Sequence, residues 1–380
     1  MNPVYLDSNA TTPLLPEVWE AMQPALCEAF GNPASAHSVG RKARQLLEDA
    51  RENIAALLGA LPEQVIFTSG ATEANNLALF GLVESSLVDS HILASPLEHS
   101  CVVEPLRQLE ARGATVEWLP VSSEGIVPSK AVSALVRPET RLVSAMLVNH
   151  ETGAIQPVRA IAHALPPGVP MHTDAAQAVG KMPVNFRDLG VAALTASAHK
   201  FRGPKGVGML LLKNDTRLRP TMFGGHQQQG RRPGTEPVAL AVGMAVALEH
   251  AVRNLDANRA KLESLRERLW VGLARLASPL ILNGPAIASP DALPTTLNVS
   301  FPGCRGDLLL VALDLAGIAC STGSACSSGS LLPSPVLRAM GVPDDVLRSA
   351  IRFSFGAELM MDAMDEAAEK IAMVIDRFRA

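Results

Sequence analysis

Short apolar runs alternate with longer amphipathic stretches through the first two thirds of the chain. The apolar runs show almost no polar alternation, which predicts strands buried on both faces of a sheet. We expect strands at Val65–Thr68, His91–Ser95, Arg141–Val148, Val169–Thr173, Ala192–Ser197 and Val207–Leu212. We expect helices at Glu17–Phe30, Ser38–Leu58, Ala71–Phe80, Cys101–Arg112 and Val158–Ala164. This alternation is typical of a mostly parallel sheet covered by helices on both sides.

The pattern changes after about Thr235, where two long helical runs follow one another without a strand between them. A stretch rich in Pro, Gly and Ala comes next, and shorter strand and helix patterns then close the chain. This order predicts a second, smaller α+β domain after the α/β part. The expected elements are helices Ala239–Asn254 and Leu255–Leu276, strand Thr296–Phe301, helix Asp307–Leu315, strand Ala350–Phe355 and helix Met361–Phe378.

Composition narrows the class of protein. Of the 380 residues, 48% are hydrophobic and 18% charged, which supplies material for a large buried core. The net charge is −4 and no run of Lys and Arg is long enough to indicate nucleic-acid binding. The longest apolar runs have the length of strands, and the first six residues lack the pattern of a signal peptide. We therefore expect a cytoplasmic protein with no membrane or nucleic-acid partner.

The chain has five cysteines and no Cys-x-x-Cys pair, which argues against a disulfide framework and against a metal site. We expect Cys27, Cys101, Cys304 and Cys320 to pack as small apolar residues, with Cys101 the least certain because it follows His99. Cys326 differs, because it lies in a stretch of Ser, Thr, Gly and Ala from residue 321 to 330. A flexible, exposed loop suits a nucleophile that must move between substrate and acceptor.

Three segments at the ends of predicted strands carry candidate chemistry. Ser69–Asn75 joins a strand to a helix, so its backbone N–H groups and the Thr72 hydroxyl suit a phosphate, although an ordinary helix cap reads the same way. Asp174 ends another strand and needs a cationic partner such as a protonated pyridine nitrogen, unless it caps a helix. Lys200 ends a third strand and is the candidate for Schiff-base chemistry, ahead of Lys205 between Pro204 and Gly206.

These segments, in this order, resemble the NifS/IscS-type cysteine desulfurases of the class V aminotransferase group. The resemblance covers nearly the whole chain. It is carried by residues 5–13, 30–35 and 69–75, by Glu98-His99, by residues 172–177, by His199-Lys200 with its Gly-Pro-Lys-Gly tail, and by residues 232–235, 322–326 and 351–354.

The resemblance implies an α/β protein of pyridoxal-phosphate fold type I, like aspartate aminotransferase. A large domain, residues 12–255, would hold a mostly parallel seven-stranded sheet. A smaller α+β domain, residues 1–11 and 256–380, would carry the Cys326 loop. The resemblance also implies a homodimer, pyridoxal 5'-phosphate as cofactor, L-cysteine as substrate, and a sulfur-acceptor protein in iron–sulfur cluster assembly or thiolation.

Residue roles follow from the same resemblance. Lys200 would form the internal aldimine and later remove the α-proton, and Cys326 would take the sulfur as a persulfide while alanine leaves. Asp174 would pair with the pyridinium nitrogen, Gln177 would bind the phenolic oxygen, and His99 would stack on the ring. The phosphate cup would comprise Gly70, Ala71, Thr72, Ser197 and His199, with Thr235 reaching the cofactor of the other subunit. The substrate would be bound by Asn9, His150 and Arg352.

Two features depart from the family pattern. His150 stands where the family usually has Asn, which predicts either a tolerated change or an altered substrate preference or pH dependence. The chain also ends soon after its final helical pattern, whereas Isc-type members typically carry a longer tail, so we expect weaker docking to an Isc-type scaffold.

Three other functions remain open from the sequence. The first is another enzyme of the same group: a selenocysteine lyase, a cysteine-sulfoxide or cystine lyase, or an aminotransferase. Loss of activity in Cys326→Ala would separate a desulfurase from these enzymes. The second is a non-catalytic sulfur carrier, which has no chemical need for both Lys200 and Cys326. The third is a nucleotide-binding protein, which the missing P-loop lysine makes remote.

Overall fold

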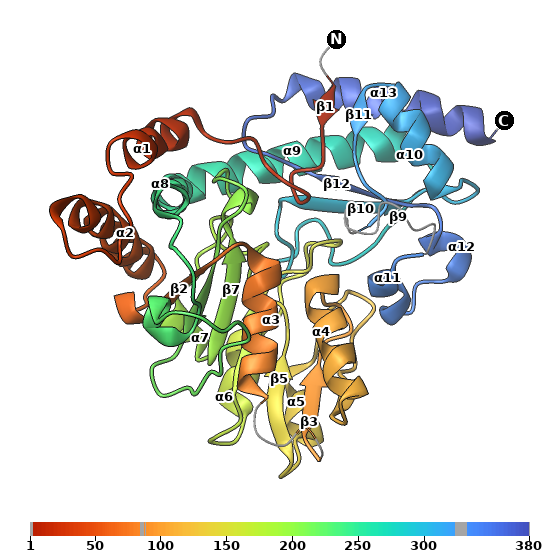
Figure 1. Ribbon diagram of the computed structural model, residues 1–380. Coiled ribbons are helices and arrows are strands. Elements are labelled where there is room, and N and C mark those ends of the chain that lie inside the picture. Colours follow the sequence, from red (N-terminus) through yellow and green to blue (C-terminus); the bar gives the residue numbers. More distant parts are fainter. Residues whose placement is uncertain (1–2, 84–86, 88, 324–332, 380) are drawn as a thin grey trace.

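Seven strands form the central sheet of the computed structural model (Figure 1). The structure describes residues 3–83, 87, 89–323 and 333–379. Within these ranges the strand order is β2-β8-β7-β6-β5-β3-β4, and only β8 is antiparallel to its neighbours. The expected mostly parallel sheet is confirmed. Its strands are β2 (Val65–Thr68), β3 (His91–Ala94), β4 (Thr115–Trp118), β5 (Thr140–Ser144), β6 (Met171–Asp174), β7 (Ala193–Ser197) and β8 (Gly208–Leu212).

Both faces of this sheet are apolar, because successive residues of a strand point to opposite sides. In β2, Ile66 belongs to the cluster beneath α3 and α4, whereas Phe67 belongs to the cluster beneath α2 and α8. The helices of this part are α1 (Pro16–Cys27), α2 (Ser38–Leu57), α3 (Ala71–Leu82), α4 (Ser100–Ala111), α5 (Ser129–Leu135), α6 (Val158–Ala164), α7 (Phe186–Leu189) and α8 (Val238–Arg253), with short 3-10 helices η1 (Pro62–Gln64), η2 (Ala198–Lys200) and η3 (Gln227–Gly230).

Most predicted bounds agree with the structure to within two residues, two were wrong, and one strand of the large sheet was missed. The predicted strand Arg141–Val148 ends at Ser144, because residues 145–148 are buried but belong to a loop in which Leu147 N donates to Asp174 O at 2.9 Å. The first helix ends at Cys27 rather than Phe30. Strand β4 was not predicted, because it lies at the sheet edge and none of its residues is fully buried.

The last third of the chain forms a second sheet, of order β12-β10-β9, in which both pairs are antiparallel. Near the N-terminus, β1 pairs in parallel with β11. Figure 1 shows α9 and α13 running alongside one another over this sheet. The elements are β1 (Val4–Tyr5), β9 (Ile281–Leu282), β10 (Thr296–Ser300), β11 (Ile318–Ala319), β12 (Ala350–Ser354), α9 (Leu255–Leu276), α10 (Gly306–Leu315), α11 (Pro335–Ala339), α12 (Asp344–Leu347) and α13 (Asp362–Arg379).

A separate apolar cluster joins Val4 and Leu6 to residues of α9, α10, α13, β10 and β12. The N-terminal strand therefore packs with the last third of the chain and not with the large sheet that follows it in sequence. The proposed division into residues 12–255 and residues 1–11 with 256–380 stays a prediction.

Among the described helices, none alone combines the length and hydropathy of a membrane span. Helices α8 and α9 meet these criteria only when taken together, and they are bent by 70° relative to one another.

Candidate active site

The site is built where parallel strands of the large sheet end. Gly70 follows β2, His99 follows β3, Asp174 is the last residue of β6, and Lys200 follows β7. Because these strands run in the same direction, their carboxyl ends meet at one edge, which is where open α/β sheets bind ligands. The structure thus brings together the three segments that the sequence singled out.

Lys200 ends the 3-10 helix η2 and is partly buried. Its Nζ donates to the backbone oxygen of Asn9 at 2.6 Å and to that of Ala10 at 3.0 Å. The amine is therefore directed toward the loop after β1. Two carbonyl groups hold the amine there, and a carbonyl oxygen does not replace an amine as a nucleophile.

Asp174 is buried, and a chain of hydrogen bonds fixes its carboxylate. Asn75 of α3 donates to Oδ2 at 2.8 Å, and the backbone of Ala176 donates to Oδ1 at 2.9 Å. The Asn75 amide oxygen in turn lies 3.0 Å from Nε2 of His172, whose Nδ1 lies 2.9 Å from the Ser144 hydroxyl. Burial lowers the pKa of His172 to about 4, so this imidazole is neutral and donates from Nε2 to Asn75.

His99 caps the first turn of α4, where its Nδ1 accepts from the backbone of Cys101 at 3.2 Å. Nδ1 is an acceptor in this contact, so the proton of the neutral ring resides on Nε2. Burial lowers the pKa of His99, and the charge of Asp174 opposes that effect. The preceding residue, Glu98, accepts from Met146 N at 2.6 Å, and burial raises the pKa of its carboxyl well above the usual range.

The turn between β2 and α3 lies against the ends of β7 and β8. A side chain at Gly208 would meet the backbone of Gly70 at 2.6 Å, so glycine at position 208 is what allows β8 to approach the turn. The Ser197 hydroxyl lies 3.7 Å from the place of a Cβ at Gly70. Thr72, in the first turn of α3, is exposed. Backbone N–H groups, two hydroxyls and a helix N-terminus are thus gathered as a phosphate site requires.

His199 lies in η2, two residues after Ser197, and burial, followed by the charge of Lys200, lowers its pKa to about 4. Its Nδ1 lies 3.1 Å from the Thr11 hydroxyl. The ring is therefore neutral near pH 7 and contributes one N–H donor to its surroundings.

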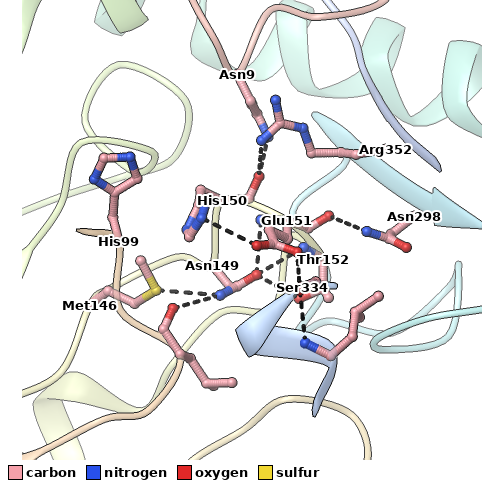
Figure 2. A network of polar contacts seen from close by, with 12 residues as sticks. Asn9, His99, Met146, Asn149, His150, Glu151, Thr152, Asn298, Ser334 and Arg352 are labelled. Atoms are coloured by element: carbon pink, nitrogen blue, oxygen red, sulfur yellow. Dashed lines mark hydrogen bonds and ion pairs between the residues drawn. The ribbon is translucent and has the colours of Figure 1, made fainter. Parts of the chain in front are cut away.

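A second group of residues faces the site from the small sheet, as Figure 2 shows. Arg352 of β12 is 1% exposed and donates from Nη1 to the backbone oxygen of His150 at 3.1 Å and from Nη2 to Asp7 at 2.8 Å. Asn9 donates from Nδ2 to the same His150 oxygen at 3.2 Å and to Thr296 Oγ1 at 2.8 Å. Among the residues that the structure describes, none is a hydrogen-bond partner of the buried Arg352 Nε.

The His150 side chain is 5% exposed, and its Nδ1 also has no hydrogen-bond partner within the described ranges. Nε2 lies 3.6 Å from Oε1 of Glu151, whose other oxygen accepts from Ser334 at 2.6 Å (Figure 2). Burial, followed by the charge of His99, holds the pKa of His150 well below its usual value. The His150 imidazole is therefore neutral and lies next to Arg352, where its Nδ1 is able to form a hydrogen bond with a polar ligand.

The comparisons with known proteins agree with this arrangement. The profile described as "Aminotransferase class-V" matches residues 4–366. The "Cysteine desulfurase IscS" of Dictyoglomus turgidum is 42% identical over 99% of this chain and 95% of its own length. A solved "NIFS-LIKE PROTEIN" superposes with a TM-score of 0.92 at 36% identity, over 99% of this chain and all of that one. The structure titled "SspA in complex with cysteine" has a TM-score of 0.81 at 34% identity, over 92% and 98% of the two chains.

The chain belongs to the class-V aminotransferase family. Its fold is accordingly the fold type I expected from the sequence. The predicted site residues form two groups in this class-V fold. At the edge of the large sheet lie Lys200, Asp174, His99 and Gln177. Beside them lie Arg352, Asn9 and His150. Thr235 is exposed, three residues after Arg232, which donates to Glu73 of α3 at 2.7 Å. Cys326 lies outside the described residues.

Sequence reasoning missed two residues of this class-V site. Asn75 holds Asp174, and its only sequence signal is its place at the end of the Ser69–Asn75 motif. Lys181 donates to Gln177 Oε1 at 2.5 Å and to Asn9 Oδ1 at 3.2 Å. It follows Gln177 by four residues, but in a segment of turns rather than a helix, so helical spacing gave no reason to pair the two.

Two expectations about cysteines were incomplete or wrong. Cys27 is exposed and does not pack in the core. Cys101 is buried, as expected, yet its sulfur lies 3.0 Å from Nδ1 of His99 and 3.1 Å from Nδ2 of Asn75. It therefore contacts two residues of the site. Among the described residues, no group of three or more His, Cys, Asp and Glu side chains is placed to hold a metal ion.

Proposed function

We propose that this protein is a cysteine desulfurase that uses pyridoxal 5'-phosphate to remove sulfur from L-cysteine, with L-alanine as the second product. The observation that carries the proposal is the convergence of Lys200, Asp174 and His99 at one sheet edge, opposite the buried Arg352. This set combines an amine, a fixed carboxylate, a neutral imidazole and a carboxylate receptor. The names of the similar proteins support the reaction.

The residues present fit the cofactor. Asp174 is a buried carboxylate whose hydrogen bonds come from neutral donors, so it can accept a hydrogen bond from a pyridinium N–H and balance its charge. The turn at Gly70, Ala71 and Thr72, with Ser197 and His199, supplies uncharged donors for a phosphate. Gln177 would bind the phenolic oxygen and Lys200 would bind the cofactor covalently. When bound, the cofactor withdraws electrons from the substrate α-carbon.

The side chains of the chain itself would perform the remaining tasks. Arg352 would bind the α-carboxylate of L-cysteine through its planar guanidinium, with His150 Nδ1 and Asn9 as neighbouring polar contacts. Lys200, once its amine is free, would remove the α-proton. His99 would carry a proton at Nε2 beside the ring and serve as an acid or base.

Cys326 would receive the sulfur. Its thiolate would attack the substrate sulfur, so an S–S bond forms while the C–S bond breaks and its electron pair stays with the carbon that becomes alanine. The persulfide on Cys326 would then pass to an acceptor protein in iron–sulfur cluster assembly or thiolation. We further propose a homodimer, in which the exposed Thr235 of each chain reaches the phosphate of its partner's cofactor.

The test pairs spectroscopy with product analysis. Purified protein should be yellow, and Lys200→Ala should abolish the colour. Sulfide and alanine should form from L-cysteine, and Cys326→Ala should abolish sulfide release. Cys27→Ala, which removes an exposed thiol elsewhere in the chain, is the matched control and should keep activity. A coloured Cys326→Ala protein that still releases product would instead indicate a selenocysteine lyase, another lyase or an aminotransferase.

A further inference from the structure

A second lysine, Lys181, lies within the site. Lys181 is partly buried, and its Nζ lies 2.5 Å from Oε1 of Gln177 and 3.2 Å from Oδ1 of Asn9. Lys200 and Gln177 contact the same residue, because both donate to the backbone oxygen of Asn9, at 2.6 and 3.0 Å. Asn9 thus joins the two lysines and the glutamine in one network.

The contact with Lys181 is one of two that fix which way the Gln177 amide points. An ammonium group has three donors and no acceptor, so only the amide oxygen of Gln177 can face it. The Nε2 group must then lie on the other side, and it is this group that donates to Asn9 O. The Asn9 carbonyl favours the same orientation, because it can only accept. Without Lys181 this single contact would hold the amide, and rotation by half a turn would present an acceptor where a donor is needed.

We propose that Lys181 is a positioning residue that holds the Gln177 amide with its N–H group toward the cofactor ring. The inference rests on the proposed function, in which Gln177 donates to the phenolic oxygen of the cofactor. A phenolate is an acceptor only, so an amide turned the wrong way would place two acceptors together. The positive charge of Lys181, one residue removed, also favours the ionised form of that oxygen.

The surroundings of Lys181 concentrate positive charge. Burial, followed by the charges of Lys200 and Arg352, holds the pKa of Lys181 well below its usual value. The charged and titratable groups around it are Lys200, His199, Arg202, Arg352, His250 and Glu358. The hydrogen bonds from Nζ to Gln177 Oε1 and Asn9 Oδ1 oppose these effects, because they favour the protonated form of Lys181.

A cavity of about 170 Å³ adjoins both lysines on the side lined by Phe355–Glu358 and Leu255. Its walls include neither His99 nor Asp174, so it is not the space in which those side chains meet a ligand. The cavity leaves room for a longer cationic head at position 181. Lys181→Arg is therefore a conservative variant, whereas Lys181→Met keeps the unbranched shape of the side chain, one atom shorter, and removes its donors.

The experiment measures the loaded protein by spectroscopy. We expect Lys181→Met to lose cofactor on the order of tenfold faster than wild type, as removal of a hydrogen bond to a charged group does. The pH at which its visible absorption changes should move upward, because a nearby positive charge is lost. Lys181→Arg should restore both quantities in large part. The matched control is Lys213→Met, which removes an exposed lysine that follows β8 at the opposite edge of the sheet.

A double variant separates positioning from a general loss of structure. If Lys181 acts through Gln177, then Lys181→Met should add little to the effect of Gln177→Leu. Multiplicative effects in the double variant, or a Lys181→Met protein that matches wild type in both measurements, would overturn the inference. A wild-type protein that binds no cofactor would instead overturn the proposed function, so the two failures are distinct.

Discussion

The imidazole of His150 packs edge-on against that of His99, with ring centroids 5.2 Å apart and planes at 80°. The two rings differ in their contacts. His99 Nδ1 caps helix α4, whereas His150 Nδ1 has no hydrogen-bond partner in the part of the chain that the structure describes. Since burial and the neighbouring cations keep His150 neutral, it can donate or accept one hydrogen bond at Nδ1 but contributes no charge near pH 7.

The first prediction concerns this unused nitrogen. Replacement of His150 by Ala should raise KM for L-cysteine by up to about tenfold, the usual worth of one hydrogen bond. His150→Asn supplies an amide in its place and should stay closer to wild type. Because the pKa of His150 is depressed, neither variant should alter the pH profile above 6.5. Steady-state kinetics with L-cysteine and L-selenocysteine provide the measurement, with His163→Asn, an exposed histidine on α6, as control. If the pH profile of His150→Asn differs from that of wild type above pH 6.5, then His150 titrates in that range.

The second prediction concerns the support of Asp174. Asn75→Leu removes the donor to Asp174 Oδ2 and leaves a buried carboxylate oxygen without it. We expect cofactor affinity to fall by about ten- to a hundredfold, since hydrogen bonds to charged groups are worth about 1.5–3 kcal/mol. Equilibrium titration with pyridoxal 5'-phosphate checks this. Asn214→Leu, an exposed position, should bind like wild type. Unchanged affinity in Asn75→Leu would show that other donors suffice.

A third prediction follows from the buried His172. Its pKa is about 4 in the folded protein and near 6.5 when unfolded, so the unfolded state binds more protons between these values. The stability contribution is complete above pH 6.5 and is lost as the pH falls toward 4, by up to about 1.4 kcal/mol per pH unit. His172→Gln cannot be protonated and should show a shallower acid dependence. Urea unfolding of the cofactor-free protein at fixed concentration, from pH 7 to 4, gives the comparison. Parallel curves for the two proteins would contradict the assignment.

The fourth prediction concerns Arg352. Its Nη groups already hold the His150 carbonyl and Asp7, and a lysine head cannot serve these and a substrate carboxylate together. Arg352→Lys should lower kcat/KM on the order of 100-fold, mostly through KM, as truncation of a buried charged contact does. Arg348→Lys, at an exposed position after α12, is the control in the same segment. A Lys variant with unchanged KM would remove Arg352 from substrate binding.

Much of the large sheet could be predicted from the sequence, because its strands are short and buried on both sides. The run Val65–Thr68 is bounded by polar residues and by Gly70, and its predicted and observed limits coincide. The prediction was wrong after Ser144, where the apolar run continues but the strand ends. An apolar run indicates burial, and it does not show that a residue is hydrogen-bonded to a neighbouring strand. Strands β1 and β11 have two residues each and pair across more than 300 positions, so no local pattern could reveal them.

The residues of the candidate site also differ in whether a local sequence pattern could reveal them. Asp174 and Lys200 were found because each ends an apolar strand, which is a local signal. Lys181 was not, because a lysine after a glycine in a turn resembles an ordinary surface residue. Its importance depends on contacts with Gln177 and Asn9, and the second of these crosses 172 positions of sequence. The position of Lys181 depends on the conformation of the turn and on contacts with residues that are distant in sequence. Neither can be predicted from a short stretch of sequence.

The position of Asn9 also has a consequence for the order in which the protein matures. Its backbone N–H donates to Ser354, Asp7 binds Arg352, and strand β1 pairs with residues 318 and 319. The segment that holds the Lys200 amine is therefore held, in turn, by residues that leave the ribosome more than 300 positions after it. The large sheet can form on the nascent chain well before that point, but the lysine cannot reach its final environment until residue 354 has been made. The newly synthesised protein would thus acquire its reactive centre later than its large sheet.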